Sequence, residues 1–450
     1  MIFKRKNTEK SEAETPAKKN EVASDEVASD KGGEVVSAKS GNSSESGKNA
    51  VLVKLKKFFE SFCEVWQKYE LLFFAIGFLT IAMVMRGVYF DFKTGDYNSC
   101  LSKWYNEIKS LGGFKGFAST VGDYTPMYKY LITIFTYIPI KDLYLYKAVS
   151  CIFDGILAVY VGLVVRHLVK NDVTALIAYA ITLFLPNTFL NSGVWAQCDS
   201  IFTCFTVMSF YYMLKGKEKT SMIMYAISFS FKIQAVFYAP VIVIALLKGK
   251  LKWKSLPFFA LGYVACALPA MIAGMSPADA LFGAYTKQVG EYNRLTLNAP
   301  NLYQFISDNY MTSDKISTMM VLCSLGICAI ACTGFYKYKG EVSDKQWLLI
   351  AYAFSILLPY VLPHMHERYY YMADIFAVIF ACVFVKKAYV SVFTIYPSFR
   401  VVQRYLFDYS NSKINFQFLA VIMLLGIVML FQFIYSEFSE KNAEESLKKE

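Results

Sequence analysis

Four clusters of ionisable or polar side chains stand at the ends of long apolar runs in this sequence. The first follows the first run and holds Asp91 and Asp96. The other three are Trp195 to Asp199, Lys232 with Gln234, and His364 to Arg368. A carboxylate near an acceptor hydroxyl can act as a general base, and a cation can stabilise a departing phosphate. Arg368 suits a bidentate grip on phosphate, to which His364 or His366 can add hydrogen bonds.

The composition places these clusters in a membrane protein. Of the 450 residues, 56% are hydrophobic and 18% are charged, and the mean hydropathy is +0.36. A soluble protein of this length carries roughly a quarter charged residues. Apolar runs near 20 residues recur, each long enough to cross about 30 Å of hydrocarbon as a helix. We therefore expect an all-α polytopic membrane protein with about 10–12 transmembrane helices.

The net charge of +11 invites a nucleic-acid interpretation, which the charge distribution disfavours. Lysine and arginine sit mainly in short clusters between the apolar runs, as the positive-inside rule predicts for cytoplasmic loops. The ten cysteines lie mostly inside apolar runs, where cysteine behaves as a small hydrophobe. Cys328 and Cys332 are one helical turn apart with no further ligands nearby, so packing is the expected role.

The chain divides into four expected segments. Residues 1–50 are polar and should form a disordered cytoplasmic tail. Residues 51–69 read as a basic amphipathic helix on the inner membrane surface. Residues 70–436 form the transmembrane domain, and residues 437–450 form a polar C-terminal tail. The loop from Asp91 to about Asp142 is rich in aromatics, which predicts interfacial helices in a large first outer loop.

The lysine and arginine clusters alone set the expected sidedness of each span. That topology puts all four polar clusters on the outer side of the membrane. Ionisable residues beside apolar helices are expensive and are candidates for function. Their convergence on one face favours a single site there. Residues 389–412 are compatible either with a short span or with a cytoplasmic hairpin.

Each cluster also has a structural interpretation. Asp91 and Asp96 could be ordinary loop acids, and Asp199 could balance the dipole of a helix that starts there. Lys232 could extend to the interface as long cationic side chains do. The pair His364 and His366 has the spacing of half a metal site, but no acidic or thiol partner at ligand spacing supports structural zinc.

The ordered set of motifs resembles the GT-C superfamily of membrane glycosyltransferases, specifically bacterial relatives of the eukaryotic GPI-anchor second mannosyltransferase. The motifs are Thr94-Gly95-Asp96-Tyr97, Lys103-Trp104-Tyr105, Gly112-Gly113, Asp123-Tyr124-Thr125-Pro126-Met127-Tyr128, Trp195-Ala196-Gln197-Cys198-Asp199-Ser200, Phe231-Lys232-Ile233-Gln234-Ala235 and His364-Met365-His366-Glu367-Arg368-Tyr369. They are spread over most of residues 70–385. The family often has glycine in its Trp-Gly-Gln motif, where this chain has Ala196.

The resemblance implies a GT-C-like catalytic domain over residues 70–436 and an inverting transfer from a polyprenyl-phosphate-linked sugar. It implies an acidic base in the first outer loop, which points to Asp96 first and Asp91 second. Lys232, His366 and Arg368 would handle the donor phosphate, and Gln197 and Asp199 would shape the site. The remaining expected substrate-binding residues are Asp123, Tyr124, Trp195, Gln234, His364 and Glu367. Some relatives use a divalent cation, so a metal stays possible without assigned ligands.

Together with the topology set by the charges, the resemblance implies a multi-pass hexosyltransferase, mannosyltransferase-like, in a bacterial plasma membrane with its active site on the outer face. Its expected partners are the lipid-linked donor, a glycan or lipid-linked acceptor and membrane lipid, without nucleic acid. The alternative is a transporter or flippase of lipid-linked glycans. A transporter should show midplane charges or paired broken helices, often with internal repeats.

Overall fold

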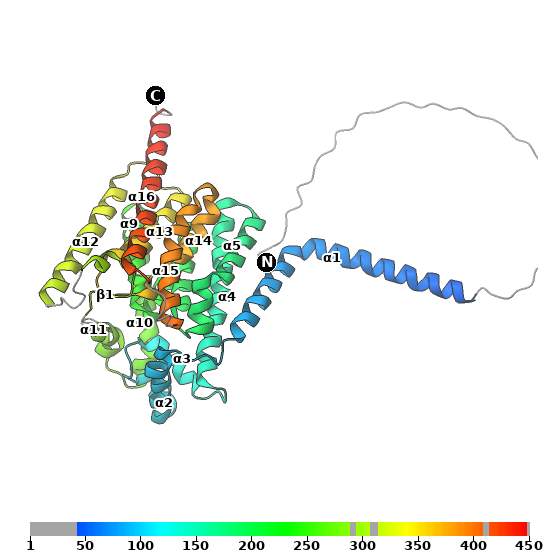
Figure 1. Ribbon diagram of the computed structural model, residues 1–450, viewed down its shortest axis with the longest axis horizontal. Coiled ribbons are helices and arrows are strands. Elements are labelled where there is room, and N and C mark those ends of the chain that lie inside the picture. Colours follow the sequence, from blue (N-terminus) through cyan, green and yellow to red (C-terminus); the bar gives the residue numbers. More distant parts are fainter. Residues whose placement is uncertain (1–42, 289–293, 307–313, 408–413, 448–450) are drawn as a thin grey trace, which may run out of the picture. The chain divides into compact units, whose positions relative to one another are not determined.

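The computed structural model describes residues 43–288, 294–306, 314–407 and 414–447 (Figure 1). The chain divides into two units, residues 1–74 and 75–450. The expected disordered tail lies outside the described residues as far as residue 42. Helix α1 (Ser43–Gly87) starts in the first unit and is continuous where an interfacial helix and a separate first span were expected. In the first unit, the indole of Trp66 stacks on the ring of Phe73, with ring centroids 5.2 Å apart.

The second unit is almost entirely helical, and its helices lie where the apolar runs predict them. They are α2 (Ser102–Leu111), α3 (Pro126–Phe135), α4 (Asp142–Val169), α5 (Asp172–Phe184), α6 (Pro186–Phe189), α7 (Asp199–Leu214), α8 (Glu218–Phe231), α9 (Ala239–Leu247), α10 (Leu256–Ile272), α11 (Ala284–Gln288), α12 (Asp314–Lys337), α13 (Asp344–Val361), α14 (Tyr371–Val383), α15 (Tyr389–Phe407) and α16 (Phe416–Leu447). Short 3₁₀ or π turns are η1 (Tyr97–Leu101), η2 (Gly113–Ala118), η3 (Leu190–Val194), η4 (Ile233–Tyr238), η5 (Trp253–Ser255), η6 (Asp279–Gly283), η7 (Leu302–Phe305), η8 (Glu367–Tyr370) and η9 (Val385–Lys387). The all-α polytopic fold is confirmed.

Helices α13 and α14 form the centre of this unit. The side chains of α13 are buried from Gln346 to Val361, and those of α14 from Tyr371 to Phe380. A helix that is apolar all round is stable only when neighbours cover every face. Accordingly α13 packs on α14 and α16, and α14 packs on α4, α5, α7 and α15. A capping box of Ser343 and Gln346 defines the start of α13.

Five helical segments among the described residues are long and apolar enough to cross a membrane, and a bent pair makes a sixth. They are Lys54–Gly87, Asp142–Val169, Trp253–Ile272, Ser317–Lys337 and Phe416–Ser439, with Asp172–Phe184 plus Pro186–Val194 as the bent pair. This number is below the expected 10–12 spans. Helices α7, α8, α9 and α14 are shorter than 18 residues, the first turn of α13 is polar (Asp344, Lys345 and Gln346), and α15 carries Arg400 and Arg404. Those helices are packed among the others.

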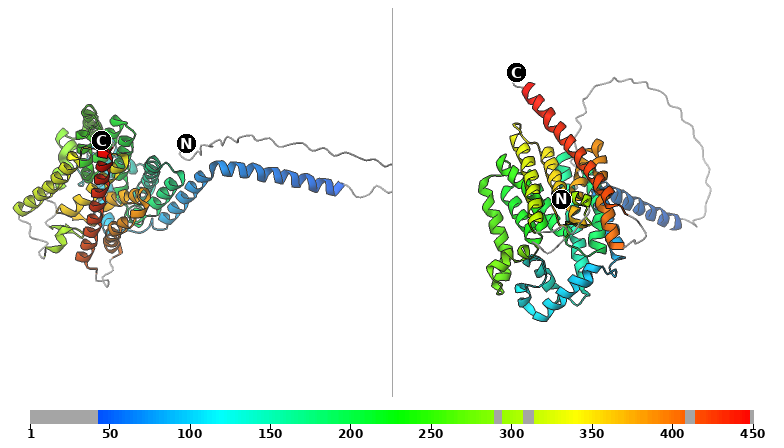
Figure 2. Two further views of the ribbon diagram at one scale, coloured as in Figure 1. Left: turned by 90° about the horizontal axis from the view of Figure 1, so that it is seen from above. Right: turned by 60° about the vertical axis from the view of Figure 1, so that its left-hand side comes forward.

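The expected interfacial helices of the first loop lie together at one end of the helical body. Figures 1 and 2 show α2 and α3 there, whereas the last turns of α16 project from the opposite end. Residues 437–447 of the expected polar tail belong to α16. One small parallel sheet pairs β1 (Thr296–Leu297) with β2 (Met365–His366), so the segment after α11 is tied to the connection between α13 and α14.

Candidate active site

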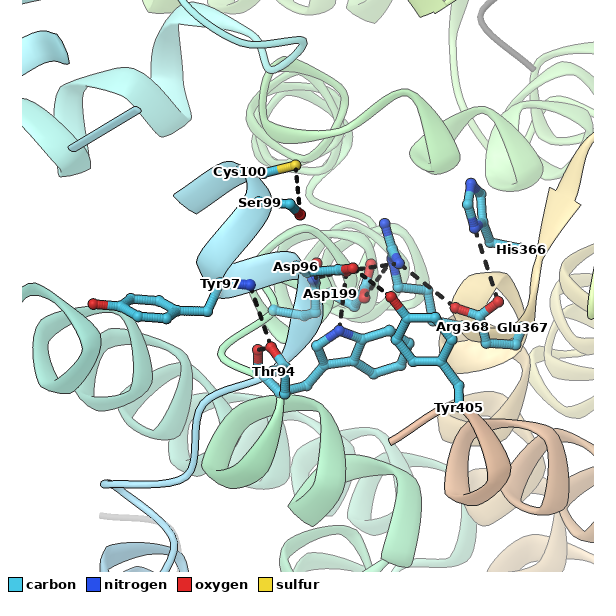
Figure 3. Close-up of polar contacts among 12 residues, drawn as sticks. Thr94, Asp96, Tyr97, Ser99, Cys100, Asp199, His366, Glu367, Arg368 and Tyr405 are labelled. Carbon is cyan, nitrogen blue, oxygen red and sulfur yellow. Dashed lines mark hydrogen bonds and ion pairs between the residues drawn. The ribbon is translucent and has the colours of Figure 1, made fainter. Parts of the chain in front are cut away.

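The four polar clusters meet at helix ends in the second unit. Asp96 directly precedes η1, Trp195 to Asp199 joins η3 to α7, Lys232 follows the last residue of α8, and residues 364–368 join α13 to α14. Figure 3 shows the side chains of Asp96, Asp199, Glu367, Arg368 and Tyr405 gathered at one place. Segments that lie far apart in the sequence therefore build one cluster of charges.

A break between two helices positions the second cluster. Helix α5 ends at Phe184, α6 starts at Pro186, and the two segments that flank this break are bent by 49°. Proline lacks an N–H and disfavours a helical residue before it, so Leu185 is extended with ψ 125°. After η3 the chain passes through Ala196 with φ +65°. This left-handed conformation suits glycine better than alanine, which carries a Cβ.

Asp96 is the centre of the hydrogen-bond network. Its Oδ2 accepts from Trp195 Nε1 at 3.0 Å, from Gln197 Nε2 at 2.9 Å and from Arg368 Nη1 at 3.3 Å. Its Oδ1 accepts from the hydroxyl of Tyr405. The Asp96 side chain keeps 22% of its surface exposed. The carboxylate is thus held firmly by protein donors while remaining reachable from outside.

The turn that carries Asp96 is held by its own residues. Thr94 Oγ1 accepts from the backbone N–H of Tyr97 at 3.3 Å, which closes the turn around Asp96. The same hydroxyl donates to the carbonyl oxygen of Trp195 at 3.5 Å and ties the turn to the second cluster. The hydroxyl of Tyr97 donates to Asp142 at the start of α4 at 2.9 Å. The turn is therefore anchored on both sides of the acid.

A buried ion pair lies beside Asp96. Lys232 Nζ donates to Asp199 Oδ1 at 2.5 Å, and the side chains are 4% and 1% exposed. Asp199 Oδ2 also accepts from Asn191 Nδ2 at 2.8 Å. The Lys232 ammonium lies over the ring of Tyr124, 5.7 Å from its centroid. Asp199 is more than a helix-dipole partner, because it neutralises a buried lysine from another helix end.

Arg368 lies among three acids, Asp96, Asp199 and Glu367. Its Nη1 is 3.3 Å from Asp96 Oδ2 and 3.7 Å from Glu367 Oε1, and its Nε is 4.0 Å from Asp199 Oδ2. The guanidinium lies over the indole of Trp195, 5.2 Å from the ring centroid. Three carboxylates therefore share two cations, Arg368 and Lys232.

His366 completes the group next to Glu367. Its Nδ1 lies 3.8 Å from Glu367 Oε2. Burial lowers the pKa of His366 below its usual range, and the positive charges of Arg368 and Lys232 lower it further against the opposing effect of Glu367. A neutral imidazole can both donate and accept a hydrogen bond, which suits contact with a phosphate or with a sugar hydroxyl.

The structure separates the two candidate bases. Asp91 is exposed, and its Oδ1 accepts from the hydroxyl of Tyr144 at 2.5 Å and from Lys141 Nζ at 3.4 Å. The hydrogen bond from Tyr144 lowers the pKa of Asp91. None of the contacts described for Asp91 reaches the cluster around Asp96.

Three other expected substrate-binding residues have different surroundings. His364 has φ +62°, its Nδ1 is 2.7 Å from the carbonyl oxygen of Arg294, and its Nε2 is 2.6 Å from Ser317 Oγ. It therefore fastens the loop containing β1 and the start of α12 to β2. Asp123 accepts from Gln288 through its backbone oxygen at 2.8 Å. Gln234 is buried in η4, and no described contact joins it to Asp96.

The sequence does not predict two members of the cluster, Tyr405 and Asn191. Tyr405 belongs to α15, the segment that the sequence left open between a span and a hairpin. The chain has 33 tyrosines, so residue type alone carries no signal. Asn191 sits five residues before Ala196 inside an apolar run, where an amide is a weak hint of a buried hydrogen bond.

The cluster was expected to leave room for a divalent cation. Among the described residues, no three side chains of histidine, cysteine, aspartate or glutamate gather as metal ligands. The carboxylates of the site are engaged by arginine, lysine, tryptophan, glutamine and tyrosine donors instead. The residues present do not fit a metal centre.

Comparison with known families places this cluster in a chemical context. Residues 123–273 match the family described as dolichyl-phosphate-mannose-protein mannosyltransferase. The match covers the second and third polar clusters and supports a multi-pass membrane glycosyltransferase. It leaves Asp96 and residues 364–368 outside its bounds. No curated protein matches the chain.

Proposed function

We propose that the protein transfers a hexosyl group, mannosyl in the first instance, from a polyprenyl-phosphate donor to a glycan or lipid-linked acceptor. The observation that carries this proposal is the placement of Asp96 against Arg368, within reach of the Lys232–Asp199 pair. It combines a partly exposed carboxylate with two cations and a neutral histidine. The family match over residues 123–273 supports the donor class.

In the proposed reaction Asp96 is the general base. The acceptor oxygen attacks the anomeric carbon while its proton passes to the Asp96 carboxylate. The bond between that carbon and the phosphate oxygen breaks, and its electron pair leaves with the polyprenyl phosphate. Attack from the face opposite the leaving group inverts the configuration. Arg368, Lys232 and His366 stabilise the charge that develops on the phosphate.

The charge balance of the site favours exchange of partners on donor binding. Asp96, Asp199 and Glu367 outnumber Arg368 and Lys232, so both cations are already neutralised. A donor phosphate must take hydrogen bonds that the carboxylates now accept. Arg368 would then turn from Asp96 to the donor phosphate, so donor binding would change the hydrogen bonds of the proposed base.

The proposed location is the outer face of a bacterial plasma membrane. The helix ends opposite the site support it, because α7, α9 and α14 lead from the site end to Lys215, Lys248 and Lys386. A glycosyltransferase that faces outward should act on a membrane-impermeant acceptor in right-side-out vesicles. Transfer only in inverted vesicles would refute the outer location.

The deciding experiment supplies purified protein with polyprenyl-phosphate mannose labelled in the sugar, and follows loss of label from the lipid. We expect Asp96→Asn to lower transfer by about 10²–10⁴-fold, because the amide cannot take the proton. Asp91→Asn is the matched control, since it changes the same group in the same loop outside the cluster, and it should keep near wild-type transfer. Full activity of Asp96→Asn would remove Asp96 as the base.

The rival function is a carrier of lipid-linked glycans. The charges of the site lie at helix ends rather than along the middle of a span, which disfavours a carrier. The same preparation in sealed vesicles distinguishes the two. Movement of intact labelled lipid across the bilayer, with the sugar–phosphate bond unbroken, would favour the carrier.

A further inference from the structure

Tyr405 covers the catalytic candidate in two ways at once. Its hydroxyl donates to Asp96 Oδ1 (Figure 3). Its ring stacks on the indole of Trp195, with centroids 4.7 Å apart and an angle of 26° between the planes. Tyr405 reaches the site from the last turn of α15. A single side chain therefore contacts both the acid and the aromatic surface beside it.

The two carboxylate oxygens of Asp96 differ in how many further hydrogen bonds they can accept. Oδ2 accepts three N–H donors, from Trp195, Gln197 and Arg368, which exceeds the usual two lone pairs of a carboxylate oxygen. Among the described contacts, Oδ1 accepts only from Tyr405. An acceptor hydroxyl that gives its proton to Asp96 must therefore approach Oδ1. The Tyr405 hydroxyl occupies that position.

Among the four hydrogen-bond donors to Asp96, Tyr405 is the most exposed and therefore the one that an incoming molecule contacts first. Trp195 is 0% exposed, Gln197 is 4% exposed, and the Arg368 side chain is 13% exposed. Tyr405 is 38% exposed. Surrounding side chains hold Trp195 and Gln197 in place on Oδ2, and these two donors fill its lone pairs even when Arg368 turns to a donor phosphate. The tyrosine instead lies at the surface near a helix end, where local opening costs least.

We propose that Tyr405 occupies the acceptor subsite of the substrate-free protein, and that the acceptor is a pyranoside. A pyranoside presents a hydroxyl beside an apolar ring face, so it can replace the tyrosine on Asp96 Oδ1 and on the Trp195 indole together. Water or a simple alcohol has a hydroxyl but no apolar ring face, so it could replace the tyrosine on Asp96 only. This inference rests on the proposed function for the meaning of the subsite, and its test requires no transfer.

A second tyrosine–aspartate pair in the same unit provides the control. Tyr144 donates to Asp91 Oδ1 at 2.5 Å, and the Asp91 side chain is 81% exposed. Tyr144 has Phe90 as its aromatic neighbour, at 5.9 Å with the rings tilted by 47°. The pair reproduces the hydroxyl–carboxylate contact of Tyr405 without a stacked indole. Tyr144→Phe therefore matches Tyr405→Phe in chemistry.

The test measures how fast the Asp96 carboxylate reacts. Purified protein is treated with a water-soluble carbodiimide and a small amine, and peptide mass spectrometry gives the rate of modification at each aspartate. Tyr405→Phe and Tyr405→Ala should speed modification of Asp96, and Tyr144→Phe should speed only that of Asp91. Asp154, which is 0% exposed, should stay unmodified in every variant and so reports an intact fold.

Methyl α-mannopyranoside then probes the subsite itself. It should slow modification of Asp96 in Tyr405→Phe at a concentration on the order of tenfold lower than in the wild type, because a competing charge-assisted hydrogen bond is gone. Equal protection in the two proteins would overturn displacement. Absence of protection in all of them would overturn the sugar subsite. Loss of transfer with protection intact would instead count against the proposed function alone.

Discussion

Two arginine–aspartate pairs in the same helical unit have opposite surroundings. Arg86 Nε donates to Asp154 Oδ2 at 2.9 Å, and the two side chains are 1% and 0% exposed. Arg368 and Asp96 are 13% and 22% exposed. Both pairs join segments that are distant in the sequence, yet only the second is open to a substrate.

The N–H groups of Arg86 donate to several other acceptors within the protein besides Asp154. Arg86 donates to Ser192 Oγ at 3.2 Å and to the carbonyl oxygens of Ala82 at 3.0 Å and Leu183 at 2.8 Å. A Cβ added at Gly193 would lie 2.9 Å from Arg86 Cγ, so the backbone of η3 closes directly on the arginine. The Arg86 pair acts as a brace between α1, α4 and the bent pair, whereas the Arg368 pair can exchange partners.

Neutralising the acid of each pair should separate these roles most strongly. Asp154→Asn leaves the Arg86 charge buried without a counter-ion, and should lower the free energy of unfolding by about 3–5 kcal/mol. Asp96→Asn should change it by less than about 1 kcal/mol, because its pair is partly solvated. Denaturation in mixed micelles measures both. A similar decrease in the free energy of unfolding in the two variants would show that the Asp96 pair is as structural as the Asp154 pair.

Arginine-to-lysine substitutions sharpen the same contrast while keeping the charge. Lysine in place of Arg86 cannot reach all four acceptors, so Arg86→Lys should cost about 1–3 kcal/mol of stability with normal transfer per folded molecule. Arg368→Lys should keep stability and lower transfer by about 10²-fold, since the phosphate loses its planar partner. Both are read from thermal melting and the labelled-donor assay. If Arg86→Lys lowered transfer and Arg368→Lys lowered stability, the catalytic role would belong to the Arg86 pair instead.

The smallest effect concerns pH and His366. Its pKa is lowered in the folded protein by burial, so the unfolded chain binds the proton more readily. The resulting stability is complete above the unfolded pKa of about 6.5 and is lost as the pH falls from there toward the folded pKa. The wild type should therefore lose thermal stability more steeply than His366→Gln as the pH falls below about 6.5. Parallel pH profiles would contradict this.

The sequence predicts the helices and the polar clusters that form the site, but not which of these side chains contact each other. The positions of α4, α10 and α12 follow from runs of apolar residues, and the four polar clusters are visible where those runs end. Charge in the intervening loops then places the clusters on one face. Whether one carboxylate touches another group on that face is beyond such reasoning, since a pattern of charges gives sides and not distances.

The choice between Asp91 and Asp96 illustrates the limit. The two acids are five residues apart, and both follow the same helix. Only the packing of η1 and α4 turns Asp96 inward to Trp195 and leaves Asp91 with Tyr144 at the surface. His364 and His366 divide in the same way, because pairing of β1 with β2 ties the first to Arg294 and leaves the second beside Glu367.

The sequence by itself determined that the chain crosses a membrane as helices, and which residue types stand at the helix ends, because both depend on neighbours within one segment. The tertiary structure alone decided which of those residues meet. Asp96 and Tyr405 are 309 positions apart, and their contact requires every helix between them to be packed. Hydrophobic length is a local property, whereas a hydrogen bond between two helix ends depends on the whole fold.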